Sequence, residues 1–293
     1  MRPQMVQRLA AVEVTVPSPA DAATFLASVL DFERRGANGP DGTEHLTAEG
    51  EYGLQPPPRM LSLVPGPELG IAGLTFEVGS ASALTVVRER LDQLGVDHEP
   101  LDDDWAGGAG IRFGAPRALR VSCRVRPPPF TLALAPSDVR PRRLGHVNLK
   151  VPDPQATASF FCDALGLRLT EQLGEMLFFL RVRSDHHNLA FRPAAAPSVH
   201  HVAFEIPGWD SIRVICDHLA ARGHAIEYGP GRHAPGHQLF LYLREPSSGL
   251  RLELFTDMAH IDDEETFRPI RREINRARSV NVWGPAPPAS FLE

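Results

Sequence analysis

Two short stretches of the chain repeat one pattern, and that pattern decides the fold. Residues 9–17 read LAAVEVTVP, and residues 144–152 read LGHVNLKVP. In each stretch apolar residues alternate with other residues, which is typical of a β-strand. Each strand then leads into a proline that follows Ser18 or Asp153, an order that signals the start of a helix. The two stretches therefore predict the same strand–helix unit in two places.

Two further pairs of segments repeat in the same order. Residues 73–78 (GLTFEV) match residues 201–206 (HVAFEI), and each segment is followed by a helical pattern. Residues 119–123 (LRVSC) match residues 250–254 (LRLEL). Internal copies of this kind indicate a duplicated architecture. We therefore predict an α+β fold of four βαβββ modules, arranged as two tandem domains that each form a half-open barrel.

The chain is expected to divide at a proline-rich stretch. Residues 126–143, RPPPFTLALAPSDVRPRR, form the expected linker, and residues 130–134 within it are a candidate short strand. Residues 1–125 then form a first, degenerate module pair without metal, and residues 144–262 form the second, catalytic pair. Residues 263–293 remain as a C-terminal tail and candidate lid, whose end is too proline-rich for a helix or a central strand.

The bulk composition narrows the class of protein. The 293 residues carry a net charge of −6, 43% are hydrophobic, and no basic cluster stands out, so nucleic acid is not expected as a partner. No apolar run is long enough to span a membrane, and the N-terminus lacks the apolar stretch of a secretory signal, which predicts a cytoplasmic protein. The cysteines, Cys123, Cys162 and Cys216, fit reduced thiols in that compartment.

The two halves differ at three positions that carry chemistry. Aligning them places small residues of the first half opposite metal-binding residue types of the second: Ala11 opposite His146, Gly73 opposite His201, and Ser122 opposite Glu253. A lone histidine in a strand is usually structural. Two histidines and a carboxylate on separate strands, however, form the ligand set of a non-haem Fe(II) site. The same ligand set also binds Mn(II). A metal would also remove the cost of burying an unpaired carboxylate.

Further polar residues indicate a layer around this site. Asn148 faces the same side of its strand as the first candidate ligand, two residues away. His233 and Tyr242 can each donate or accept a hydrogen bond, and they suit acid–base roles around a phenol. The pairs 186–187 and 200–201 are both His-His and are expected on strands. Because successive side chains of a strand alternate, one member of each pair is expected to point away.

The second half resembles a known family. The signature is residues 229–258, GPGRHAPGHQLFLYLREPSSGLRLELFTDM, and the segments LGHVN, HHNLAF and HHVAF add to it. These motifs resemble type I extradiol ring-cleavage dioxygenases of the vicinal oxygen chelate superfamily, in the homoprotocatechuate and catechol 2,3-dioxygenase branch. The resemblance implies the glyoxalase/bleomycin-resistance/extradiol dioxygenase fold, with metal only in the second domain. The first half resembles the family only as a degenerate copy.

The resemblance assigns roles by position. The implied ligands of Fe(II), or alternatively Mn(II), are His146, His201 and Glu253. The implied catalytic residues are His187, which acts as acid and base near oxygen, and His233 and Tyr242, which bond the substrate oxygens. The implied substrate-binding residues are Asn148, Phe179, Tyr228 and Phe191.

Two positions depart from the family pattern. Tyr228 stands where relatives that act on carboxylated catechols tend to have arginine, and Phe179 stands where a tryptophan lines the carboxylate pocket. These departures argue against a carboxylated substrate, unless Arg276 or Arg278 of the tail supplies a charge.

The expected activity is extradiol cleavage of a catechol with O2, which gives a hydroxymuconic-semialdehyde-type product in aromatic hydrocarbon catabolism. A homo-oligomer is expected from the family. One alternative is another metal-dependent enzyme of the same superfamily, such as an isomerase, epimerase or transferase, since fold does not fix function. That chemistry does not need the layer of His187, His233 and Tyr242. The other alternative is a non-enzymatic protein that binds an aromatic ligand, which would not need a metal triad.

Overall fold

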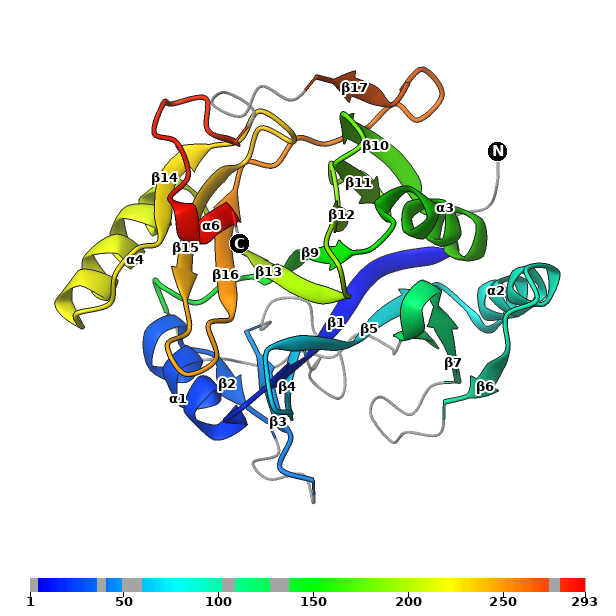
Figure 1. Cartoon of the computed structure of the whole chain (residues 1–293), viewed down its shortest axis with the longest axis horizontal. Coiled ribbons are helices and arrows are strands. Elements are labelled where there is room, and N and C mark those ends of the chain that lie inside the picture. Colours follow the sequence, from blue (N-terminus) through cyan, green and yellow to red (C-terminus); the bar gives the residue numbers. More distant parts are fainter. Residues whose placement is uncertain are drawn as a thin grey trace.

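The computed structural model describes residues 5–35, 41–48, 60–101, 109–126, 137–273 and 280–292. Its elements follow the predicted order, in which one strand and one helix precede three strands in each of four modules. Figure 1 shows the two halves as separate curved sheets, the first in blue and cyan and the second in green to red. The predicted α+β fold is therefore confirmed.

The first half forms an eight-stranded sheet in the order β2-β3-β4-β1-β5-β8-β7-β6. Its first module consists of β1 (Val6–Val16), α1 (Pro19–Leu30), β2 (Glu33–Arg34), β3 (Glu44–Thr47) and β4 (Leu61–Pro65). Its second module consists of β5 (Gly70–Val78), α2 (Ala81–Gln93), β6 (His98–Pro100), β7 (Gly110–Ala115), a 3-10 turn η1 (Pro116–Ala118) and β8 (Leu119–Val125).

The second half forms a nine-stranded sheet in the order β14-β15-β16-β13-β9-β12-β11-β10-β17. Its first module consists of β9 (Arg143–Val151), α3 (Pro154–Leu165), β10 (Arg168–Leu173), β11 (Leu177–Arg181) and β12 (Leu189–Pro193). Its second module consists of β13 (Ser198–Glu205), α4 (Trp209–Ala221), β14 (Tyr228–Arg232), β15 (Leu239–Arg244) and β16 (Arg251–Thr256). In Figure 1 these strands follow one another in a curved arc.

The first helix of each half begins as the sequence predicts. Ser18 Oγ accepts a hydrogen bond from the amide of Asp21, and Asp153 Oδ1 accepts one from the amide of Ala156. A proline occupies the first turn of both helices, where its missing N–H leaves no hydrogen bond unmade. The repeated sequence signal therefore produces the same local structure twice.

The two halves share one hydrophobic core. Strand β1 contacts β9, β5 contacts β13, and α2 contacts α3. Phe32 of the first half meets Phe204 edge to face, with ring centroids 5.0 Å apart, and Phe76 packs on Phe161 at 6.1 Å. Most buried apolar residues of both halves belong to a single cluster, and three smaller clusters lie in the second half. Burial of this apolar surface fixes the second sheet against the first.

The strand registers confirm the alignment of the halves. In the first sheet one row of neighbours runs Ala11–Thr75–Ser122, and in the second the matching row runs His146–Ala203–Glu253. A second pair of matches is Glu13–Gly73 in the first sheet and Asn148–His201 in the second. The positions that the repeat pairs in sequence are thus equivalent in space.

An ion pair lies at the first-half position that matches the candidate site. Arg120 Nη2 lies 2.6 Å from Glu13 Oε2. A side chain at Gly73 would meet both of these residues, because its Cβ would lie 3.2 Å from Glu13 Oε2 and 3.3 Å from Arg120 Nε. The space that a ligand histidine occupies in the second half is therefore filled by the neighbouring ion pair in the first.

The tail contributes two short elements. Strand β17 (Ile270–Arg272) pairs in parallel with β10 at the edge of the second sheet, and helix α6 (Ala289–Leu292) follows the prolines. The expectation that the final segment contains no helix is wrong for these last residues, which lie beyond the prolines. The candidate strand 130–134, Arg276 and Arg278 lie outside the described residues. None of the helices that the structure describes has the length and apolar character needed to cross a bilayer.

Candidate metal centre

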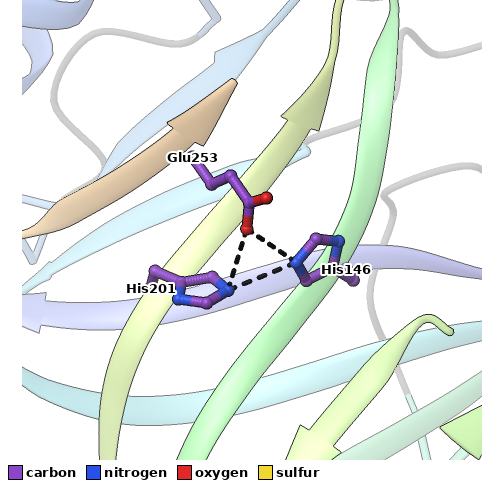
Figure 2. Close-up of side chains that lie close together, drawn as sticks. All are labelled: His146, His201 and Glu253. Carbon is purple, nitrogen blue, oxygen red and sulfur yellow. Dashed lines mark hydrogen bonds and ion pairs between the residues drawn. The ribbon is translucent and has the colours of Figure 1, made fainter. Parts of the chain in front are cut away.

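Three side chains from neighbouring strands converge in the second sheet. His146 lies on β9, His201 on β13 and Glu253 on β16, and β13 pairs with both other strands. His146 Nε2 lies 3.2 Å from His201 Nε2 and 3.0 Å from Glu253 Oε2, and His201 Nε2 lies 3.1 Å from the same oxygen. Figure 2 shows the two rings and the carboxylate directed at one point. The structure thus brings the three expected ligands together, and all three are buried.

The spacing of these donor atoms suits a divalent metal. Donors that bind a metal at about 2.1 Å and at right angles lie about 3.0 Å apart. The other oxygen of Glu253, Oε1, has no hydrogen-bond partner among the described residues and lies 3.6 Å from His233 Nε2. A buried carboxylate oxygen without a partner is rare unless a ligand satisfies it. Within the described part of the chain, this is the one cluster of His, Cys, Asp and Glu able to hold a metal ion.

Burial and mutual contacts set the charges of the cluster. The pKa of His201 is lowered to about 4, chiefly because burial disfavours the imidazolium. Burial alone would raise the pKa of Glu253, but the charge of His146 and the close approach of the His146, His201 and His233 rings hold it well below 4.5. At neutral pH His201 is therefore neutral and Glu253 is ionised, which are the protonation states that metal ligands need.

A chain of hydrogen bonds fixes the tautomer of His201. His200 Nε2 lies 3.0 Å from the carbonyl oxygen of Phe291, and because that oxygen only accepts, His200 Nε2 carries the proton. Burial lowers the pKa of His200 well below 6.5, so its ring is neutral and its Nδ1 must accept. His201 Nδ1 lies 2.8 Å from His200 Nδ1 and therefore donates to it. The lone pair of His201 Nε2 is left free to bind a metal.

A similar chain lies behind His187. His186 Nε2 donates to Glu171 at 3.0 Å, and Glu171 is ion-paired with Arg272. His186 Nδ1 lies 3.0 Å from His187 Nδ1, so when His186 is neutral it accepts from His187 there. Burial, followed by the charge of His146, lowers the pKa of His187 well below 6.5. His187 is then a neutral ring with a free Nε2 lone pair, able to accept a proton.

His233 and Tyr242 form a third polar contact beside the cluster. His233 Nε2 lies 2.9 Å from the Tyr242 hydroxyl, and His233 Nδ1 bonds to the carbonyl oxygen of Val280. Because that carbonyl only accepts, His233 Nδ1 carries a proton and Nε2 can accept from the hydroxyl. Burial, followed by the charge of Glu253, raises the pKa of Tyr242 well above 10, so the phenol stays protonated.

A cavity of about 730 Å³ opens onto these groups. All but two of the expected site residues line it: His146, Asn148, Phe179, His187, His201, His233, Tyr242 and Glu253. The tail closes one side of the cavity with Val280, Ala286, Pro287, Phe291 and Leu292. The Oδ1 atom of Asn148 is buried without a hydrogen-bond partner among the described residues, so it is available to a ligand.

Phe191 and Tyr228 do not line the cavity, contrary to expectation. Phe191 is fully buried in the hydrophobic core and stacks on Phe161 of α3, with ring centroids 5.4 Å apart. Because strand side chains alternate, the next residue of β12 faces the cavity instead. Tyr228 lies behind Tyr242 and donates its hydroxyl to the carbonyl of Pro285 at 2.8 Å. It therefore holds the tail.

The expectation that one member of each His-His pair points away from the site is wrong for His200 and His201, whereas His187 lines the cavity and His186 does not. A register shift between Val199 and His201 breaks the alternation of β13, and His200 and His201 both line the cavity. The pair 186–187 precedes the first residue of β12 and so is not in a strand. No role was predicted for His200, His186 or Glu171. The two His-His pairs in the sequence were the signal that could have indicated the supporting histidines.

The comparisons with known proteins agree with this site. Residues 143–254 match the family described as the Glyoxalase/Bleomycin resistance protein/Dioxygenase superfamily. Metapyrocatechase 2 of Cupriavidus necator is 31% identical over 156 residues, which cover 53% of this chain and about half, 48%, of that protein. Metapyrocatechase of Geobacillus stearothermophilus is 25% identical over 285 residues, which cover 90% of this chain and 85% of that protein.

Two relatives are named for different metals. The manganese-dependent 2,3-dihydroxybiphenyl 1,2-dioxygenase of Geobacillus genomosp. 3 is 24% identical, over 76% of this chain and 78% of that protein. The iron-dependent extradiol dioxygenase of Rhodococcus jostii (strain RHA1) is 25% identical, over 74% of this chain and 70% of that protein. The names of these relatives thus specify manganese in one case and iron in the other.

Solved structures show the same fold. The Mn(II)-bound glyoxalase from Novosphingobium aromaticivorans has a TM-score of 0.85 at 25% identity, covering 98% of this chain and 94% of that one. Homoprotocatechuate 2,3-dioxygenase from Arthrobacter globiformis has a TM-score of 0.83 at 23% identity, covering 99% and 92%. Residues 143–254 of this chain thus match the Glyoxalase/Bleomycin resistance protein/Dioxygenase superfamily, and the curated relatives of the chain include extradiol dioxygenases.

Proposed function

We propose that this chain is a metal-dependent extradiol dioxygenase that opens the ring of a catechol next to its diol with O2. The observation that carries the proposal is the convergence of His146, His201 and Glu253 in a cavity with three further polar side chains that can bond substrate oxygens. The curated relatives named as metapyrocatechases and extradiol dioxygenases support the same reaction class.

His146, His201 and Glu253 would hold the metal, with Fe(II) as the first candidate and Mn(II) as the alternative. When bound, such a metal lowers the pKa of a coordinated hydroxyl and provides the redox centre that oxygen chemistry needs. The free Nε2 lone pair of His201 and the ionised Glu253 support this assignment.

Tyr242 and His233 are suited to orient the diol. Tyr242 keeps its proton because its pKa lies well above 10, so it can donate a hydrogen bond to a catechol oxygen. His233 Nε2 carries a lone pair and can accept from a neighbouring hydroxyl. A bound diol would replace the bond between these two side chains, with Tyr242 as the donor and His233 as the acceptor.

His187 is suited to accept and return a proton. Its ring packs on His146 with centroids 4.2 Å apart, and its Nε2 lone pair is free when His186 is neutral. A general base with a lowered pKa can take a proton from the substrate hydroxyl and give it back when the ring has opened. We also infer that the tail, residues 280–292, covers the cavity during this chemistry, since five of its residues line it.

Oxygen uptake tests the proposal. The purified protein is loaded with Fe(II) or Mn(II) under nitrogen, mixed with a catechol, and then exposed to air. We expect one O2 to be consumed per diol and a yellow ring-opened product to form. If neither metal supports oxygen uptake with any of a panel of catechols, the proposal is wrong.

A matched pair of variants ties the activity to the site. Glu253→Gln removes the carboxylate ligand, and we expect it to lower the bound metal, measured by elemental analysis, and to abolish oxygen uptake. Glu13→Gln makes the same change in the first half, where Glu13 forms a partly exposed ion pair with Arg120. It should leave metal content and activity unchanged, since exposed ion pairs contribute little.

The likeness to a glyoxalase structure favours one second candidate, a metal-dependent reaction that uses no oxygen. A protein of that kind would bind metal at the same three residues but would leave the oxygen concentration unchanged with every catechol. The oxygen electrode therefore separates the two candidates.

A further inference from the structure

Arg192 is a cation that the proposed chemistry does not use. It lies on β12, lines the cavity, and is half-buried. No hydrogen bond or ion pair joins its guanidinium to any residue that the structure describes. Other shielded arginines of the second half are paired: Arg181 with Glu264 and Arg251 with Glu227. Among the described residues Arg192 is therefore an exception, and its unpaired charge in the cavity wall suits an anionic ligand.

Among the residues that the structure describes, the cavity offers Arg192 no free carboxylate to pair with. The one carboxylate that lines the cavity among the described residues, Glu253, belongs to the candidate metal cluster. The cavity wall also includes Pro193, Phe291 and Leu292, which are apolar. Burial, followed by the charge of Arg251, lowers the pKa of Arg192, although a guanidinium stays charged at neutral pH. A positive charge in such a wall is stabilised when an anion binds beside it.

The strand register places Arg192 at the distance of a ring substituent. In the strand register Arg192 of β12 lies opposite Lys150 of β9. Lys150 is four residues beyond His146, which is also on β9. At about 3.3 Å per residue, the two positions lie about 13 Å apart along the sheet. A catechol whose diol lies at His146 cannot bring its reacting carbons to that position, but a side chain on its ring extends toward it. Arg192 therefore lies too far along the sheet to sit beside a diol at His146, and its position suits a substituent on the ring.

We propose that Arg192 binds a carboxylate on the ring substituent of the substrate, so that this enzyme prefers catechols with an anionic side chain. The guanidinium offers a planar pair of donors that matches a carboxylate. This inference rests on the proposed function. Arg192 would also supply the positive charge that is missing at position 228, where relatives acting on carboxylated catechols tend to have arginine. Tyr228 itself faces the tail and not the cavity.

Paired substrates test the proposal. The probes are 3,4-dihydroxyphenylacetate and its amide, which have the same size and diol but differ in charge. Binding is measured by calorimetry under nitrogen on the metal-loaded protein, and KM and kcat are measured in air. We expect the wild type to bind the carboxylate roughly 10- to 100-fold more tightly than the amide, as for a charge-assisted hydrogen bond.

Two substitutions locate the effect at Arg192. Arg192→Met should remove the preference for the carboxylate by raising its Kd and KM, while the amide is bound and cleaved as before. Arg192→Glu should instead favour 3,4-dihydroxyphenethylamine, whose substituent is a cation. The matched control, Arg213→Met, removes an exposed arginine of α4 that pairs with Asp217, and it should leave all ratios unchanged.

Several outcomes would overturn the inference. Equal binding of the carboxylate and the amide by the wild type, or an equal loss of both in Arg192→Met with an unchanged melting temperature, assigns Arg192 a structural role. If Arg192→Met does not fold, Arg192→Lys, which keeps the charge, must retain the preference. Failure of oxygen uptake contradicts the proposed function, whereas the binding ratio under nitrogen still tests Arg192 separately.

Discussion

At the scale of single residues, the site depends on which nitrogen of each histidine carries the proton. The carbonyl of Phe291 fixes the tautomer of His200, and His200 in turn fixes the tautomer of His201. The Nε2 lone pair of His201 is thereby directed at the cluster. Such outer contacts hold a ligand ring in one tautomer and one orientation, and their loss typically lowers metal affinity. The backbone of the tail therefore acts on a candidate metal ligand through two hydrogen bonds.

The first residue-scale prediction concerns His200. His200→Phe keeps an aromatic ring but removes the acceptor for His201 Nδ1, so we expect metal affinity to fall about 10- to 100-fold. Competition with a coloured chelator measures this affinity. His218→Phe, a change on the surface helix α4, should leave the affinity unchanged. An unchanged affinity in His200→Phe would show that the tautomer of His201 is fixed in another way.

The second residue-scale prediction concerns Gly145. A Cβ at this position would overlap the ring of Phe255, which packs against His146 with centroids 5.2 Å apart. We expect Gly145→Ala to lower the free energy of unfolding by about 1–3 kcal/mol, as overpacking of a core does. Urea denaturation measures it. Gly114→Ala is the control, since a Cβ there meets nothing within 4 Å. Equal effects of the two substitutions would contradict the packing argument.

At the scale of elements, the short helix α6 is held by charged groups that come from elsewhere in the second half. Arg244 and Arg251 both donate to the carbonyl of Ser290, and both are ion-paired with Glu227. Ser290 Oγ also donates to Glu227. Phe291, the next residue, packs on Tyr242 at 4.7 Å. Fixation of this one turn thus positions an aromatic wall of the cavity.

Acid should loosen this attachment. Burial raises the pKa of Glu227, but hydrogen bonds from Arg251 and Arg244 outweigh burial and lower it to about 2, below its ordinary value of 4.5. A carboxylate with a lowered pKa in the folded state stabilises the protein above about pH 4.5 and loses that contribution as the pH falls toward 2. We expect the melting temperature of the wild type to exceed that of Glu227→Gln at pH 6, and the difference to shrink below pH 4.5. A difference that does not depend on pH would contradict the assigned charge.

At the scale of the whole molecule, one core joins two sheets with different roles. Phe32 and Phe76 of the first half pack on Phe204 and Phe161 of the second, so neither sheet is expected to unfold alone. A ligand that binds only the folded state stabilises it, by about 2.7 kcal/mol at a concentration one hundred times its Kd. Metal bound in the second half should therefore stabilise the first half as well.

Scanning calorimetry tests this coupling. We expect one unfolding transition, which moves to higher temperature when Fe(II) or Mn(II) is added under nitrogen and returns when the metal is chelated. Glu253→Gln should show the single transition without the shift. Two separate transitions, of which only one responds to metal, would show that the halves unfold independently.

The sequence predicts the architecture better than the details of the cavity. Duplication makes the modules visible in the sequence, and the same alignment singles out His146, His201 and Glu253 on separate strands, which the structure shows to be neighbours. Local irregularities could not be predicted, because no residue pattern marks the register shift beside His200. Tertiary packing also decides which face of a strand lines the cavity, and the sequence alone does not show it. For this reason the prediction placed Phe191 in the cavity, whereas the structure places Arg192 there.

The ion pair between Glu13 and Arg120 has a consequence for stoichiometry. It occupies, in the first half, the place where the second half presents its second imidazole, and even a Cβ at Gly73 would force both side chains to shift. Saturation is therefore expected at a single ion for each polypeptide. An engineer who wished to build a second metal site in the first half would have to replace Arg120 and Glu13 before grafting any new ligand onto that sheet.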